Sequence, residues 1–168
     1  VNEDGKETKT VFSGDIGNND IPLLSEPTMI EDADYLVMES TYGDRTHATP
    51  PDYAIELARV LKDTFGRGGN LVIPAFSVGR TQEMLYFMRR IKTEHLLPEY
   101  ENFEVYVDSP LAVEATSIFN KNVEDCFDEE ALALVQQGIN PIGFPGLRMA
   151  ITSDESKMIN FDEKPKVI

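Results

Sequence analysis

The sequence has a single cysteine, two histidines and no tryptophan. Cys126 therefore has no partner for an internal disulfide bond, and His47 and His95 stand apart, with no HxH, HExxH or CxxC pattern around either. A zinc site built entirely from this chain is not expected. Uninterrupted apolar runs reach only four to five residues, whereas a membrane-spanning helix needs about 20. These absences predict a cytoplasmic protein with no membrane partner.

Glycine-rich phosphate loops are also missing. Neither GxxxxGK[ST] nor GxGxxG occurs, and the one glycine cluster, Gly66–Gly69, precedes a strand instead of following one, so nucleotide binding by that route is rejected. Residues 15–20 resemble a calcium loop in composition but lack its alternating acids. Cys126 falls in a predicted helix and is interpreted as a small buried apolar residue.

The charge is strongly acidic but unevenly distributed. The 168 residues are 41% hydrophobic and carry a net charge of −15, which fits one folded core and argues against nucleic-acid binding over the whole surface. Residues 1–44 hold 11 acids and 2 bases, residues 45–92 hold 4 acids and 8 bases, and residues 93–168 hold 15 acids and 5 bases. A polyanion should therefore meet the middle third.

The first 46 residues read as a short β-rich segment. Polar flanks around Gly5 predict a turn, so residues 1–12 are expected to form a β-hairpin that ends beside the glycine-flanked Asp15. The almost continuous apolar run over residues 34–39 predicts a strand that is buried on both faces.

From residue 50 the pattern changes to alternating helices and strands. A helix is predicted to open at Pro50–Asp52 and to end at Gly66. Further helices are expected over 79–92, 112–123, 129–137 and 154–160, and strands over 71–74, 103–107, 147–152 and from 166 onward. This alternation predicts an α/β fold, with a mainly parallel, Rossmann-like sheet covered by helices on both faces and preceded by the short β-hairpin segment.

Three acids stand at the carboxyl ends of predicted strands, where α/β folds place their chemistry. Asp15 and Glu39 are in this position, and Asp108 shares it. Taken alone, each is interpreted more readily as a turn or helix-capping residue than as a catalytic one.

Four ordered blocks change that balance. Residues 12–17, 33–45, 73–83 and 105–112 resemble the metallo-β-lactamase enzymes that carry a β-CASP domain, a group of nucleases in RNA processing and DNA repair. The resemblance covers nearly the whole chain from residue 11. It divides the chain into a piece of a metallo-β-lactamase domain over 1–46 and a β-CASP domain over 47–168, which is expected to be truncated at its C-terminus.

The resemblance also assigns roles to two of these acids. Asp15 matches a carboxylate that bridges two zinc ions, and Glu39 matches an active-site acid that acts beside a histidine from farther along the chain; both are catalytic candidates. The family's histidine-rich metal motifs have no counterpart in these 168 residues. Zinc is therefore expected in the full-length parent only, with Asp15 as one ligand, and this fragment is expected to bind no zinc and to be inactive alone.

Basic and aromatic side chains near these acids are candidates for contacting nucleic acid. They are Arg45, Arg80, Tyr42 and His47. An arginine near strand ends suits bidentate phosphate binding, and tyrosine or histidine can stack on a base. The alternative for Arg80 is a structural pair with Glu83 at the start of its helix.

The resemblance therefore predicts a fragment of a zinc-dependent hydrolase that cleaves RNA phosphodiester bonds, the fragment forming the lid of the substrate channel. The implied partner is single-stranded RNA, with DNA as a possibility, and a homodimer of the full-length protein is allowed. The alternatives are a non-catalytic RNA-binding or scaffold member of the same family and an unrelated Rossmann-like ligand-binding domain.

Overall fold

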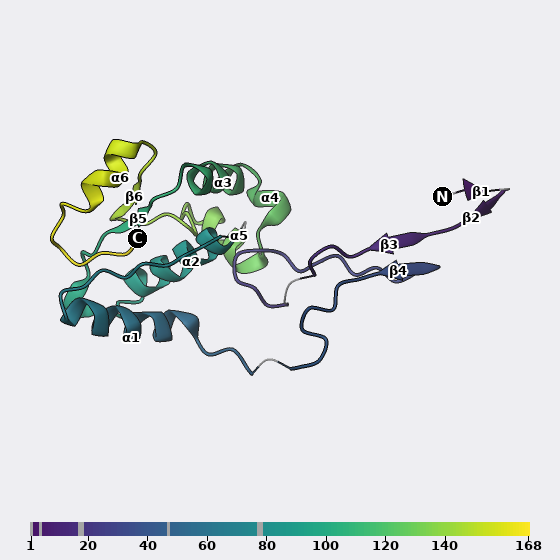
Figure 1. Cartoon of the computed structure of the whole chain (residues 1–168), viewed down its shortest axis with the longest axis horizontal. Coiled ribbons are helices and arrows are strands. Elements are labelled where there is room, and N and C mark those ends of the chain that lie inside the picture. The colour runs from purple at the N-terminus through teal and green to yellow at the C-terminus, as the bar shows by residue number, and fades with distance from the viewer. Residues whose placement is uncertain (1, 4, 17–18, 47, 77–78) are drawn as a thin grey trace. The chain divides into compact units, whose positions relative to one another are not determined.

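The chain folds into two compact units (Figure 1). This computed structural model describes residues 2–3, 5–16, 19–46, 48–76 and 79–168. The N-terminal unit contains the residues up to Ile21 together with Ser25–Pro50, and the C-terminal unit contains Pro22–Leu24 and Pro51–Ile168. The assignment of residues 1–46 and 47–168 to two named domains stays a prediction.

The N-terminal unit contains two small sheets. Strands β1 (Asn2–Glu3) and β2 (Lys6–Glu7) form an antiparallel hairpin, whereas β3 (Thr10–Phe12) pairs in parallel with β4 (Tyr35–Val37). The expected hairpin is therefore confirmed for β1 and β2, whereas its extension through residues 10–12 is wrong. A parallel partner requires a long connection, which the polar stretch between Phe12 and Tyr35 provides.

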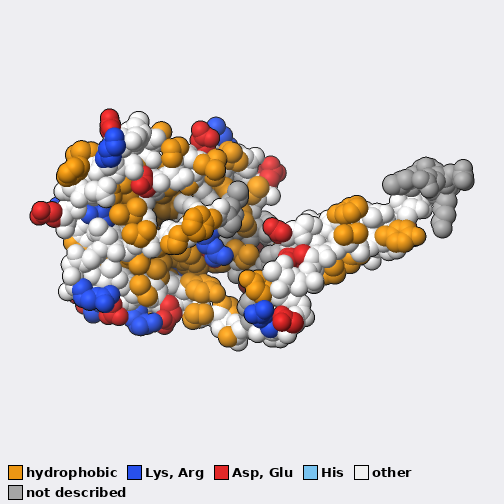
Figure 2. Space-filling view, viewed as in Figure 1, with side chains coloured by type: hydrophobic (Ala, Val, Ile, Leu, Met, Phe, Trp, Pro, Cys, Tyr) orange, Lys and Arg blue, Asp and Glu red, His pale blue; other side chains and the backbone are white. Residues whose placement is uncertain are grey.

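The prediction that residues 34–39 are buried on both faces is also wrong. Tyr35, Leu36 and Val37 are 65%, 58% and 54% exposed. Within the part of the chain that the structure describes, β3 and β4 form a two-stranded sheet, and two strands alone cannot bury both of their faces. Figure 2 shows hydrophobic side chains exposed along this segment.

The helices of the C-terminal unit follow the predicted pattern. Asp52 caps the first of them, because its carboxylate accepts the N–H groups of Ala54 and Ile55. The elements are α1 (Tyr53–Gly66), α2 (Arg80–Thr93), the 3₁₀ turn η1 (Pro98–Tyr100), α3 (Pro110–Lys121), α4 (Val123–Cys126), α5 (Glu129–Gln136) and α6 (Ser153–Ile159). None of the helices in the described residues is long and apolar enough to cross a membrane.

Parallel pairing organises the strands of the C-terminal unit. Strand β5 (Val105–Val107) pairs in parallel with β6 (Leu147–Met149). On the other side of β5, Val167 forms parallel bridges to both Val105 and Leu71. The segments around residues 71, 167, 105 and 147 therefore lie side by side in that order, which confirms the α/β class and its parallel sheet.

The core lies where α1 and α2 pack on this sheet. Leu61 and Phe65 of α1 and Leu85, Met88 and Ile91 of α2 are at most 3% exposed. The ring of Phe65 lies 5.7 Å from that of Phe103, just before β5. Polar groups within the core are paired, as when the buried Gln82 amide donates to the Thr116 hydroxyl at 2.9 Å.

Cys126 does not have the buried position that its helical location suggested. It ends the four-residue helix α4, and its side chain is exposed. A single turn of helix has no extended apolar face to press into a core, which explains the failed expectation.

Two glycines with positive φ provide a matched test of the fold. Gly146 (φ +90°) enters β6, and a Cβ there would lie 3.0 Å from the Phe103 carbonyl oxygen; at Gly138 (φ +75°), after α5, a Cβ would meet nothing within 4 Å. We expect Gly138→Ala to lower the free energy of unfolding by about 1–2 kcal/mol, the cost of left-handed backbone alone. Gly146→Ala should cost more, because the backbone around Phe103 must also move. Denaturant titration measures both values, and equal losses would contradict the close approach.

Candidate functional site

The parallel register of β3 and β4 brings two segments together at the carboxyl ends of these strands. Phe12 stands opposite Val37, and the backbone N–H of Ser13 continues the ladder by donating to the Val37 carbonyl at 2.9 Å. The residues that follow are Asp15 on one strand and Glu39 on the other. The two acids selected from the sequence therefore belong to one strand edge.

Asp15 lies in the irregular segment that follows β3. Gly14, just before it, has φ +57°, a conformation that favours glycine. The Asp15 side chain is exposed. Among the described residues its carboxylate makes no hydrogen bond or ion pair, so both oxygens are available to a ligand.

Glu39 is held from both sides. Its Oε1 accepts the backbone N–H of Ile16 at 2.9 Å, and its Oε2 accepts the hydroxyl of Thr41 at 2.6 Å. These donors stabilise the charged form, the Thr41 hydroxyl most strongly, and they lower the pKa of the Glu39 carboxyl. Glu39 is therefore an ionised, oriented carboxylate.

The described residues supply only part of the metal site that the resemblance implies. The described residues hold no group of three or more His, Cys, Asp or Glu side chains that could bind a metal ion. Asp15 offers an uncommitted carboxylate, which suits one position of a zinc site, whereas both oxygens of Glu39 are occupied by protein donors. The described chain fits one ligand position and not a complete site.

The candidates for nucleic-acid contact in the N-terminal unit form a small exposed group. The Arg45 guanidinium pairs with Asp44 at 3.0 Å and lies 5.6 Å from the centroid of the Tyr42 ring. Both partners of the Arg45–Asp44 pair are exposed, and a surface ion pair of this kind is weak enough for a phosphate to replace the carboxylate. His47 lies outside the described residues.

Arg80 belongs to the C-terminal unit and opens α2. Its guanidinium pairs with Glu83 at 2.7 Å, which is the structural contact weighed as its alternative role. The Arg80 side chain is 53% exposed, so it retains access to solvent, whereas that of Glu83 is 14% exposed. Burial raises the pKa of the Glu83 carboxyl, and Arg80 acts against this shift.

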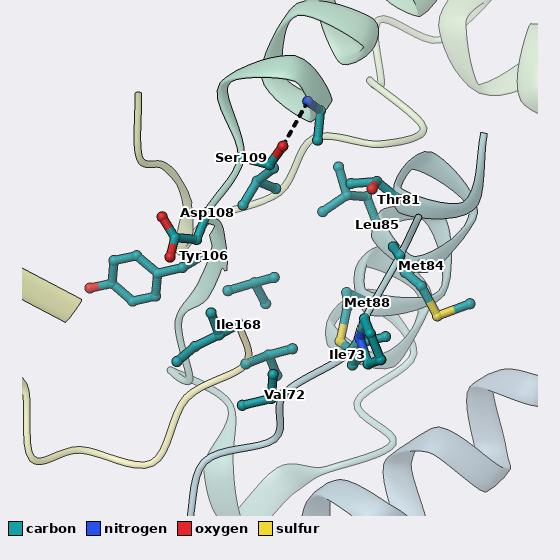
Figure 3. Close-up of a pocket in the computed structure, with 16 residues that line it drawn as sticks. Val72, Ile73, Thr81, Met84, Leu85, Met88, Tyr106, Asp108, Ser109 and Ile168 are labelled. Carbon is teal, nitrogen blue, oxygen red and sulfur yellow. Dashed lines mark hydrogen bonds between the residues drawn. The ribbon is translucent and has the colours of Figure 1, made fainter. Parts of the chain in front are cut away.

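A cavity of 330 Å³ lies at the carboxyl end of β5 (Figure 3). Ile73, Met88 and Ile168 are among its mainly apolar walls. Two of its polar residues serve the fold: Ser109 caps α3 by accepting the N–H of Ala112, and Asp108 accepts the hydroxyl of Ser156 at 3.0 Å. Asp108 shared the strand-end position of Asp15 and Glu39, but here it links β5 to α6.

Two site residues were missed in the sequence. Ser13 accepts the backbone N–H of Glu39 at 3.2 Å, and Thr41 donates to the Glu39 carboxylate. The spacing of Glu39 and Thr41, two residues apart, is a local signal for such a bond. The contact of Ser13 depends on the pairing of β3 with β4, which the expected hairpin did not include.

Comparison with known proteins identifies the class. The Beta-Casp domain family matches residues 81–168. This match covers more than half of the chain, and the chain therefore belongs to the Beta-Casp domain family.

The relatives extend the similarity through the N-terminal unit. The chain is 35% identical over 164 residues to Ribonuclease TTHA0252 of Thermus thermophilus, 31% identical over 157 residues to Transcription termination factor FttA of Methanocaldococcus jannaschii, and 28% identical over 139 residues to Endoribonuclease YSH1 of Yarrowia lipolytica. These alignments cover 98%, 90% and 81% of this chain but 37%, 24% and 16% of the relatives. The chain thus spans little more than a third of the Thermus thermophilus relative and a smaller share of the other two.

The Arg80–Glu83 pair generates a prediction with a defined sign. Arg80→Ala removes the cation that opposes the effect of burial, so the pKa of Glu83 should rise further above its ordinary value. A carboxyl whose pKa is higher in the folded state destabilises the fold once it ionises, so the loss of stability in this variant should be greater at pH 7 than at pH 4. Carboxyl NMR titration and denaturant unfolding at both pH values measure the effect.

Arg59→Ala is the matched control, because Arg59 forms the same kind of pair with Glu56 at 2.8 Å while both side chains remain well exposed. Its stability loss should be small at both pH values. An unchanged titration of Glu83 in Arg80→Ala would contradict the role given to this pair.

Proposed function

We propose that the protein containing this chain is a zinc-dependent ribonuclease that hydrolyses phosphodiester bonds in single-stranded RNA. The observation that carries the proposal is the convergence of Asp15 and Glu39 at the carboxyl edge of β3 and β4. Two of the relatives named above are called a ribonuclease and an endoribonuclease. Family membership and a pair of acids at one strand edge support the same chemistry.

In this proposal Asp15 supplies one carboxylate to the metal, and the remaining ligands come from residues outside this chain. Bound zinc would supply an activated water and neutralise charge on the phosphate. Asp15 is suited to the role because its side chain is exposed and its carboxylate makes no hydrogen bond or ion pair to another described residue. Glu39 contributes a fixed negative charge, which would orient and stabilise a histidine cation from elsewhere in the protein.

RNA would be held by Arg45, Tyr42 and Arg80. Arg45 and Tyr42 lie together on the exposed segment after β4, where a guanidinium and a ring can contact a phosphate and a base. Arg80 would add a second phosphate contact from the start of α2. We further propose that the C-terminal unit serves as the lid of the substrate channel, and that the isolated chain is inactive because its metal ligands are incomplete.

The first test of the proposal is Asp15→Ala in the full-length protein. Loss of a metal ligand should lower the zinc content and reduce RNA cleavage by at least about a hundredfold without unfolding the protein, because the segment after β3 is exposed. Metal analysis, cleavage of a labelled single-stranded RNA and circular dichroism measure the three properties. Asp32→Ala, which removes an exposed acid from the same unit, should behave as wild type.

Normal zinc content and normal cleavage in Asp15→Ala would refute the assignment. A wild-type protein that binds RNA but never cleaves it, with zinc present, would favour the non-catalytic alternative.

The second test concerns the RNA contacts. Each of Arg45→Ala and Arg80→Ala should weaken RNA binding and reduce the slope of log K against log salt by about 1, because each would remove one phosphate contact. Arg59→Ala removes an equal charge from α1 and should leave the slope unchanged. Binding titrations at several salt concentrations give the slopes, and equal slopes in all three variants would remove Arg45 and Arg80 from the interface.

A further inference from the structure

The strand edge that carries Asp15 and Glu39 is closed by reciprocal hydrogen bonds between side chain and backbone. The hydroxyl of Ser13 accepts the N–H of Glu39 at 3.2 Å, and the carboxylate of Glu39 accepts the N–H of Ile16 at 2.9 Å. Each strand end thus supplies a side chain that binds the backbone of the other. The segment Ser13–Ile16 is fixed to Glu39 at both of its ends.

Asp15 lies inside the fixed segment. Its carboxylate makes no hydrogen bond or ion pair to another described residue, so in this part of the chain it is positioned by the backbone that carries it. Ile16 follows it directly, and the bond from the Ile16 N–H to Glu39 sets the orientation of the peptide group between Asp15 and Ile16. Whatever holds the Glu39 carboxylate in place therefore also holds Asp15.

Thr41 holds that carboxylate. A glutamate side chain has three rotatable bonds, and the Ile16 N–H binds only one of its two carboxylate oxygens, while the backbone N–H of Thr41 adds a weaker contact. The Thr41 hydroxyl donates to the second oxygen at 2.6 Å. The carboxylate is therefore hydrogen-bonded at Oε1 to Ile16, in the segment after β3, and at Oε2 to Thr41, in the segment after β4.

We infer that Thr41 is a positioning residue: through Glu39 it fixes the Ser13–Ile16 segment and thereby the backbone from which the Asp15 carboxylate projects. This inference deepens the proposed function and rests on it for the role of Asp15. The hydrogen-bonded linkage itself, from Thr41 to Glu39 to Ile16, can be measured without metal or RNA.

The experiment uses the metal-free full-length protein with selectively labelled isoleucine, so that NMR reports the Ile16 amide. Thr41→Val keeps the shape of the side chain and removes the hydroxyl, and Thr41→Ser keeps the hydroxyl. We expect the Ile16 amide to exchange at least about threefold faster in Thr41→Val and to return to the wild-type rate in Thr41→Ser. Thr49→Val removes an exposed hydroxyl elsewhere in the same unit and should have no effect.

The second readout is RNA cleavage by the same four proteins with zinc restored. Thr41→Val should lower kcat about tenfold with KM within about twofold, because a misdirected Asp15 affects the reacting centre more than RNA binding. Thr41→Ser should recover most of the rate. A general loss of folding would also shift amides far from this segment, and Glu39→Ala, which removes the hydrogen-bonded carboxylate itself, must reproduce the faster Ile16 exchange.

The outcomes separate the two proposals. Wild-type exchange at Ile16 in Thr41→Val overturns the inference, whatever the cleavage rate. Faster exchange with an unchanged kcat overturns the positioning role of Thr41. If no protein cleaves RNA, the proposed function fails, and the exchange rates still decide whether Thr41 fixes the segment.

Discussion

The parallel pairing of β3 with β4 is the constraint on which the candidate site depends. Only three residue pairs define the register, but a shift by one residue would turn every side chain to the opposite face and separate the two strand ends. With Phe12 opposite Val37, the segments after β3 and β4 begin side by side. Asp15 and Glu39, more than 20 residues apart in the sequence, then share one edge, and the bond between Ile16 and Glu39 spans 23 positions.

The two units achieve stability in different ways. In the C-terminal unit, α1 and α2 cover the parallel strands, and the buried polar groups have partners, as Gln82 has in Thr116. The N-terminal unit instead exposes the apolar side chains of β4, and its site is organised by hydrogen bonds between side chains and backbone. Apolar burial therefore stabilises the C-terminal unit, whereas directional polar contacts organise the N-terminal unit.

The sequence predicted the helices well, because their signals are local. The capping aspartate before α1 and the apolar spacing within α2 both lie within a few residues of the elements that they specify. Strand pairing is not local: a three-residue strand such as β3 carries too little pattern to identify its partner, and the hairpin assigned to it was wrong. The same limit explains the site. Asp15 and Glu39 could be selected from their own positions, but Ser13 and Thr41 acquire their meaning only from the geometry of the strand edge.

Burial was predicted least reliably, for a related reason. The apolar run of residues 34–39 is typical of a strand that helices cover on both faces. Such a run indicates which elements pack on the strand in the complete fold. Within the described residues the strand has only one neighbouring strand. The strand itself was predicted correctly. Leu36 is exposed because no other described element packs on the strand.

The position of Val167 between Leu71 and Val105 sets an order of events during folding. The segment that joins the strands around 71 and 105 comes after both of them in the sequence, and the bond from the Lys166 N–H to Asn70 spans 96 residues. A chain emerging from the ribosome can form α1 and α2 early, but the strands around 71 and 105 have no direct partnership with each other until residues 166–168 arrive between them. Until then both expose unpaired strand edges, which can pair with other chains, so the unit is open to aggregation for longer than its helical content suggests.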